Sequence, residues 1–155
     1  MKKVITFEMG LGAIFLAVVI SIVSADPQPW LLKMQTAALC ALTGGLGGVT
    51  YCLRGIYLNA CVHKRWDDNW LPWYYIRPVV SFFCGLASWL FLEAGLLVLE
   101  SQQEADATNF AYYALAFIAG YNVDKFLSKL EDIGYASWGI SKSRTAKSDS
   151  PDKAD

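Results

Sequence analysis

Charged residues within otherwise apolar segments are the positions at which this sequence could do chemistry. Charged groups are costly there unless they have a partner or a function. Glu8 and Arg54 each lie about one helical turn inside such a segment, at ends that we expect to meet. We predict that they pair within a polar network, which either orients the helices or acts as a gate whose acid and base partners separate. Its members are Glu8, Arg54, Arg77, Asn122 and Asp124.

Glu93 is a second candidate, at the opposite end of the third apolar segment. It lies about six residues, roughly 9 Å along a helix, from the end of that segment. A carboxylate at such a depth either forms a buried hydrogen bond or lines a path for cations. We therefore expect Glu93 to have either a structural role or a role in a pore or in ion sensing.

The nucleophilic and metal-ligating residues do not form a recognisable site. The four cysteines, Cys40, Cys52, Cys61 and Cys84, lack CxxC spacing, and Cys61 with His63 supplies only two of the four ligands of a zinc site. No combination of residues has the parts of a nucleophilic triad, and the glycine cluster lacks the Lys-Ser/Thr of a phosphate loop. The sequence predicts no catalytic residue, no metal, no cofactor and no enzyme activity.

The elements that position these residues are four long apolar segments. Of the 155 residues, 55% are hydrophobic and 17% are charged, against about 25% charged in a soluble domain. Each segment is about as long as a bilayer crossing of roughly 20 residues. We predict an all-α bundle of four transmembrane helices, one domain over residues 1–140, with spans at 4–24, 34–57, 78–99 and 108–123. The net charge of −1 gives no basic footprint for nucleic acid.

The basic residues predict the orientation of these spans. Twelve of the thirteen Lys and Arg residues precede the first span, lie in or beside the loop between the second and third spans, or follow the fourth span. Only Lys33 lies on the other side. This bias predicts that both termini are cytoplasmic. The first 25 residues resemble a cleavable signal peptide in their basic start and small-residue end, but Glu8 and the length of the apolar run favour retention.

Small residues on each span predict close helix packing, because helices in lipid associate through van der Waals contact and hydrogen bonds. The second span is the richest in glycine. Its glycines either pack within the bundle or mediate self-association into a homo-oligomer. The candidate packing positions are Gly44, Gly45, Gly47, Gly48, Gly85 and Gly120.

The cytoplasmic side carries the remaining candidate surface. Aromatic residues before the third span fit either a headgroup belt or a surface for a partner protein. After the fourth span the helix is predicted to continue to about residue 133 with one apolar side, which lies on the membrane or docks a partner, and Gly134 is a candidate end. The polar segment 141–155 is predicted to be disordered. The candidate partner face comprises Lys64, Arg65, Trp66, Trp70, Lys125 and Lys129.

Short motifs resemble those of small four-span bacterial inner-membrane proteins, which include membrane subunits of phage-defence systems. The motifs are Arg77-Pro78, Gly85, the run from Glu93 to Leu96 and the run from Ala116 to Tyr121. The resemblance implies a homo-oligomeric subunit in the bacterial inner membrane, acting beside a soluble cytoplasmic protein. We expect a non-enzymatic membrane sensor or scaffold that contacts lipid and a protein partner. The alternative is an oligomeric pore or ion channel.

Overall fold

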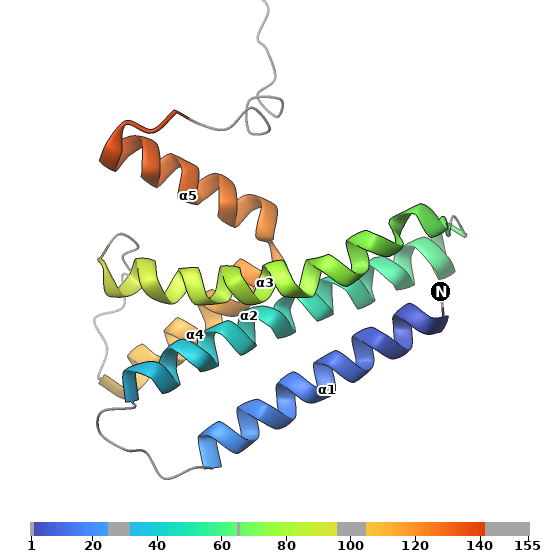
Figure 1. Cartoon of the computed structure of the whole chain (residues 1–155), viewed down its shortest axis with the longest axis horizontal. Helices are drawn as coiled ribbons and strands as arrows, with labels where there is room; N and C mark the ends of the chain where they lie inside the picture. The colour runs from blue at the N-terminus through green and yellow to red at the C-terminus, as the bar shows by residue number, and fades with distance from the viewer. Residues whose placement is uncertain (1, 25–31, 65, 96–104, 142–155) are drawn as a thin grey trace, which may run out of the picture. The chain divides into compact units, whose positions relative to one another are not determined.

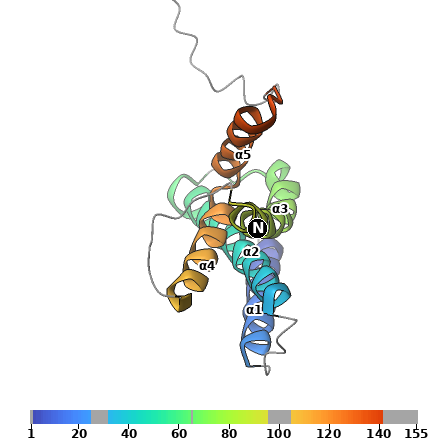
Figure 2. The same ribbon diagram turned by 90° about the vertical axis from the view of Figure 1, so that its left-hand side faces the viewer.

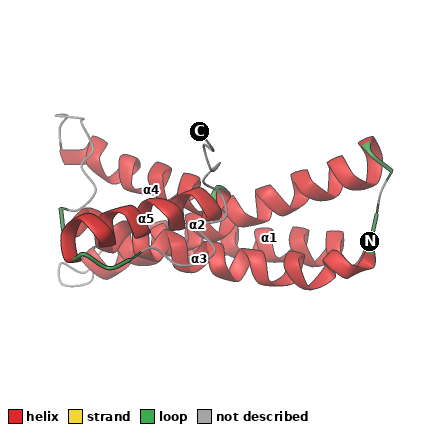
Figure 3. Cartoon of the chain, turned by 90° about the horizontal axis from the view of Figure 1, so that it is seen from above, coloured by secondary structure: helices red, strands yellow, loops and turns green. Residues whose placement is uncertain are grey.

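The computed structural model describes residues 2–24, 32–64, 66–95 and 105–141, and all regular elements in these ranges are helical (Figures 1 and 3). The chain divides into two compact units, Met1–Val123 and Asp124–Asp155. The first contains most of the apolar sequence, and the second contains nearly all of the last helix. The elements are α1 (Lys2–Ser24), α2 (Leu32–Tyr57), the π-helical turn η1 (Leu58–Val62), the short 3-10 turn η2 (Asp68–Trp70), α3 (Leu71–Glu93), α4 (Ala105–Tyr121) and α5 (Val123–Trp138).

Three helical stretches are long and apolar enough to cross a membrane: Lys2–Ser24, Met34–Val62 and Leu71–Glu93. The fourth predicted span corresponds to α4, which has 17 residues and an apolar stretch from Phe110 to Tyr121. A helix of that length extends about 26 Å, slightly less than the roughly 30 Å hydrocarbon core. The prediction of an all-α protein is therefore confirmed, and three of its helices have the length and apolar composition of membrane spans.

α2 is the central helix of the first unit and contacts α1, α3 and α4 (Figure 2). Its glycines explain this position, because a Cβ atom on each of four glycines would overlap a neighbouring helix. Gly45 faces Phe15 of α1, Gly44 and Gly48 face α3, and Gly47 faces α4. The glycine cluster is thus used for packing within one chain, and none of these four positions is left free for self-association.

The closest helix contacts involve glycines on both sides. Gly85 of α3 lies against the backbone of Gly44 and the carbonyl oxygen of Cys40, and Gly120 of α4 lies against the Gly44 carbonyl group. A Cβ on Gly44 would lie 2.6 Å from the Gly85 Cα. Backbone-to-backbone contact of this kind is available only to the smallest residues. Three helices are therefore joined at Gly44.

α1 is held less tightly than the other helices of this unit. Val4 and Glu8 are its two buried residues, and many of its large apolar side chains are exposed. In a bilayer such side chains face lipid. Contacts of Phe7 with Tyr75, at 4.8 Å between ring centroids, and of Phe15 with Phe82, at 6.2 Å, join α1 to α3.

The third helix starts earlier than predicted, at Leu71 rather than residue 78, and ends at Glu93 rather than residue 99. Pro72 is suited to its first turn, and Pro78 is accommodated inside the helix. Ala94 caps the helix through its N–H, which donates to the Leu90 carbonyl, and Gly95 follows with a φ of +69°. A left-handed glycine at this place is a common helix stop.

The helix after the fourth span also differs from its prediction. It does not continue smoothly, because a turn at Asn122 separates α4 from α5. It also passes Gly134 and extends to Trp138. Gly139, with a φ of +66°, ends it, and its N–H donates to the Tyr135 carbonyl at 2.9 Å. Segment 141–155, predicted to be disordered, lies outside the described residues except for Ser141.

Candidate functional site

Buried polar side chains in the described part of the first unit come from α1 and α3. They are Glu8, Arg77, Ser81 and Ser88. Glu8 borders an apolar core cluster formed by Val4, Cys52, Ile56 and Tyr74. Because buried polar groups need partners, the contacts of each one show what it does in the fold.

Arg77 is only 2% exposed, and its guanidinium lies over two aromatic rings. The guanidinium carbon is 4.4 Å from the Tyr51 ring centroid and 4.9 Å from that of Trp73. The Nη2 group donates to the carbonyl oxygen of Tyr121 at 3.5 Å. Tyr121 ends α4, where carbonyl groups lack helical donors and carry partial negative charge. The buried cation is thus stabilised by two ring faces and a helix end.

Tyr74 occupies the core beside this cation and is 3% exposed. Pro78 has no N–H, so it cannot donate to the Tyr74 carbonyl four residues earlier. The Cys52 thiol donates to that carbonyl instead, at an S–O distance of 3.9 Å. The Tyr74 hydroxyl accepts from Asn59 at 3.3 Å, and Trp66 stacks on the ring at 5.7 Å. Tyr74 therefore joins α3 to α2 and to the segments that follow α2.

Ser81 connects α3 to α4 at the glycine contact. It is fully buried, and its hydroxyl donates to the Gly120 carbonyl at 2.8 Å. Its Cβ and Oγ lie directly against Gly48. The side chain thus spans two helices at the point where both approach α2.

Replacing Ser81 with alanine is expected to destabilise the bundle by about 1 kcal/mol, because interhelical hydrogen bonds in membrane proteins contribute roughly 0.6 to 1.7 kcal/mol. The measurement is the unfolding free energy of the purified protein in mixed micelles. Ser21→Ala is the matched control, because the Ser21 hydroxyl is exposed and donates within its own helix to Ala17. Equal losses of unfolding free energy for the two variants would contradict a stabilising hydrogen bond from Ser81 to Gly120.

Glu8 is fully buried on the face of α1 that meets Cys52. Its carboxyl group faces the Cys52 thiol, but neither carboxyl oxygen makes a hydrogen bond of standard geometry with a described residue. The predicted pair with Arg54 does not form, because Arg54 is exposed and donates to the Tyr121 hydroxyl at 3.2 Å. Arg54 lies two residues, about 200° of helical rotation, from Cys52, so it cannot face Glu8 from the same helix.

The predicted polar network is therefore only partly assembled. Glu8 and Arg77 are buried, while Arg54 and Arg77 both reach Tyr121, through its hydroxyl and its carbonyl respectively. Asn122 is exposed at the turn, and Asp124 is exposed in the second unit. The sequence prediction missed the aromatic partners, although Trp73 and Arg77 have the i, i+4 spacing of neighbours on one helix face.

Glu93 differs from its prediction because α3 ends earlier than expected. It is the last residue of the helix and is exposed, so it is not a carboxylate one or two turns inside the bundle. The observation that suggested a pore-lining role is therefore not found.

The predicted partner face is divided between the two units. Trp70 is 53% exposed and Lys64 is exposed, whereas Trp66 is turned onto Tyr74. Lys125 and Lys129 are exposed on α5 in the second unit, and Arg65 lies outside the described residues. Among the described residues, no three His, Cys, Asp or Glu side chains are grouped closely enough to hold a metal ion.

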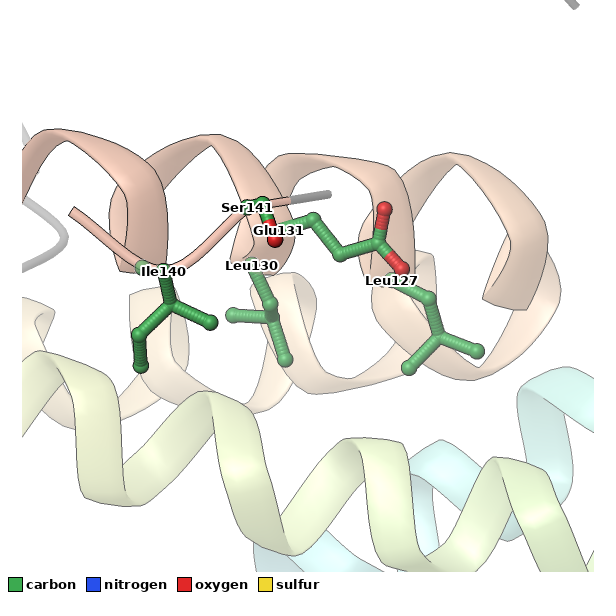
Figure 4. Close-up of a pocket in the computed structure, with 6 residues that line it drawn as sticks. Leu127, Leu130, Glu131, Ile140 and Ser141 are labelled. Carbon is green, nitrogen blue, oxygen red and sulfur yellow. The ribbon is translucent and has the colours of Figure 1, made fainter. Parts of the chain in front are cut away.

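The second unit has its own apolar surface on α5. After Gly139 the chain folds back, so that Ile140 and Ser141 border an open hollow of about 340 Å³ beside the helix (Figure 4). Tyr135 and Trp138, near the end of the helix, are each about 60% exposed. The hollow is lined by Leu127, Leu130, Glu131, Gly134, Ile140 and Ser141.

No protein-family model, curated protein or solved structure matches this chain.

Proposed function

We propose that this chain is a non-enzymatic membrane subunit, a sensor or scaffold that docks a soluble cytoplasmic partner through its second unit. The observation that carries the proposal is the exposed apolar surface of α5, which follows the membrane helices and includes Leu127, Tyr135 and Trp138. An amphipathic helix with exposed apolar residues is suited to binding in the groove of another protein. The basic residues Lys125 and Lys129 add charge for recognition of an acidic rim.

The proposed topology has four spans, with α4 as the fourth and both termini in the cytoplasm of a bacterial cell. The uneven distribution of Lys and Arg supports it, since basic residues remain on the cytoplasmic side. The proposed homo-oligomer uses surfaces other than the glycine cluster, which is occupied within the chain. The outer face of α1 is the main candidate, because Met9, Leu16 and Ile20 lie on one side of the helix and are each more than half exposed.

The resemblance to membrane subunits of phage-defence systems extends the proposal to antiviral defence. A plaque assay on cells with and without the gene and its neighbours tests this part. A pore is not proposed, because the two features that suggested it are absent from the described residues: Glu93 is not buried, and Gly44 to Gly48 are not free.

Leu127→Glu is expected to weaken partner binding at least about tenfold, because it introduces a charge into the apolar surface of α5. The measurement is co-purification in mild detergent, with the partner identified by mass spectrometry and its ratio to this chain quantified. Ser128→Glu is the control, since the neighbouring Ser128 is exposed on the polar side and bonds only to its own helix at Asp124.

Retention of the same partner in the same ratio by Leu127→Glu would contradict docking through α5. Vesicle flotation tests the alternative that α5 binds the membrane surface and not a protein partner. If a peptide of residues 123–141 floats with vesicles and Leu127→Glu abolishes flotation without changing co-purification, α5 is a membrane-surface helix instead.

A further inference from the structure

Glu8 is fully buried in the described bundle, and neither oxygen of its carboxyl group makes a hydrogen bond. It lies on the inner face of α1, one turn after Val4 of the core cluster. The other buried charge, Arg77, is held by aromatic rings and a helix end. The contacts that satisfy Arg77 therefore have no equivalent at Glu8.

The groups that face Glu8 do not neutralise a negative charge. From α2 it meets Cys52, whose thiol donates to the Tyr74 carbonyl. From α3, Tyr74 belongs to the same core cluster as Val4 and Cys52, and its hydroxyl accepts from Asn59. Arg77 of α3 donates to the Tyr121 carbonyl and lies over the rings of Tyr51 and Trp73. On α1 itself, the two lysines of the first turn are exposed.

An unpaired carboxylate in an apolar, membrane-embedded interior is strongly unfavourable, and protonation removes the charge without requiring a new partner. A proton also needs no cavity, which fits the close packing around Val4 and Cys52, both 0% exposed. We propose that Glu8 is a proton-binding site, which holds its proton in the packed bundle and whose ionisation loosens α1 from α2 and α3.

The step breaks the O–H bond of the Glu8 carboxyl, and the proton passes to water as the carboxylate becomes hydrated. α1 is the helix that can respond, because its remaining contacts are few and mostly between side chains. The backbone contacts among α2, α3 and α4 do not involve α1. This inference is independent of partner docking by the second unit.

The first test compares the pH dependence of unfolding for the purified full-length wild type and Glu8→Gln in the same detergent. The packed bundle binds one more proton than the separated helices, so wild-type stability falls as the pH rises above about 4.3, where a free glutamate ionises. The wild-type unfolding constant, divided by that of Glu8→Gln, is expected to rise by up to about tenfold per pH unit. Parallel pH profiles for the two proteins would overturn the proposal.

The second test uses wild-type protein and so does not depend on how the variant folds. Dicyclohexylcarbodiimide partitions into apolar surroundings, where a protonated carboxyl adds across its C=N bond and rearranges to a stable N-acylurea with no leaving group. Peptide mapping by mass spectrometry should find the intact reagent added at Glu8, and less of it as the pH is raised. A water-soluble carbodiimide should label the exposed Glu93 in preference to Glu8.

Absence of the label at Glu8 under conditions that label other carboxyl groups would show that no protonated, apolar Glu8 exists. That result would refute proton binding while leaving the docking proposal intact. Conversely, labelling of Glu8 together with unchanged co-purification by Leu127→Glu would support the proton site and reject docking through α5.

Discussion

Gly120→Ala is expected to destabilise the bundle by about 3 kcal/mol or to prevent its assembly. The new Cβ would overlap the carbonyl oxygen and carbon of Gly44, and neither α4 nor α2 can relieve the overlap by changing a rotamer. Overpacking of a close-packed interior typically costs about 1 to 3 kcal/mol, and an obstacle made of backbone is at the upper end. For a chain of this size the apparent melting temperature should fall by about 10 °C.

The measurement is the fraction of protein that stays monodisperse in size-exclusion chromatography after heating in detergent. Gly55→Ala on α2 is the control, because its Cβ would make an ordinary contact at 3.4 Å with the Tyr74 hydroxyl. Gly10→Ala on α1 is a second control, with nothing within 4 Å. If Gly120→Ala behaved like these controls, the backbone contact between α4 and α2 would be refuted.

The second large effect is expected at Arg77, where Arg77→Ala should destabilise the protein by about 3 to 5 kcal/mol. The variant loses two ring contacts, each worth up to about 2 kcal/mol in a desolvated site, and the hydrogen bond to Tyr121. Arg77→Lys should recover only part of the loss, because an ammonium group cannot stack on the rings of Tyr51 and Trp73 as a planar guanidinium can.

Arg54→Ala is the matched control for Arg77. Both arginines donate to Tyr121, but Arg54 is exposed, so its removal should change stability by no more than about 0.5 kcal/mol. Thermal unfolding of the four proteins in one detergent tests the ordering. If Arg54→Ala lost as much stability as Arg77→Ala, the shared bonds to Tyr121, rather than the ring contacts of Arg77, would account for the loss.

The sequence predicted the helical class and the membrane-spanning character because hydropathy depends only on local composition. It also identified the packing glycines and two buried charges, Glu8 and Arg77. Helix ends were less predictable. The segment from Leu71 to Ile76 contains one tryptophan and two tyrosines, residue types typical of a membrane interface, yet it forms the first turns of α3. The depth predicted for Glu93 was wrong for the same reason, since α3 starts and ends earlier than the predicted span at 78–99.

The partners of the buried charges depend on helix rotation, which hydropathy does not determine. Their similar depth in the membrane suggested that Glu8 pairs with Arg54. The rotation of α2 about its axis instead places Arg54 on the exposed side and Cys52 opposite Glu8. Similarly, Pro78 indicates an unsatisfied Tyr74 carbonyl, but only the structure identifies the thiol that approaches it. Residues close in depth become partners only when they also face each other.

The glycine positions of α2 and the outer positions of α1 differ in how freely they can change during evolution. Gly44 and Gly47 are restricted by backbone atoms of neighbouring helices and Gly48 by the buried Ser81 side chain, so substitution at these positions should be strongly opposed. The outer positions of α1 need only remain apolar, and their identities can change freely. Distant relatives should therefore retain Gly-Gly-x-Gly-Gly followed by Arg-Pro-x-x-Ser-x-x-x-Gly, even where overall identity has been lost. This pattern is a more durable signature of the fold than its sequence as a whole.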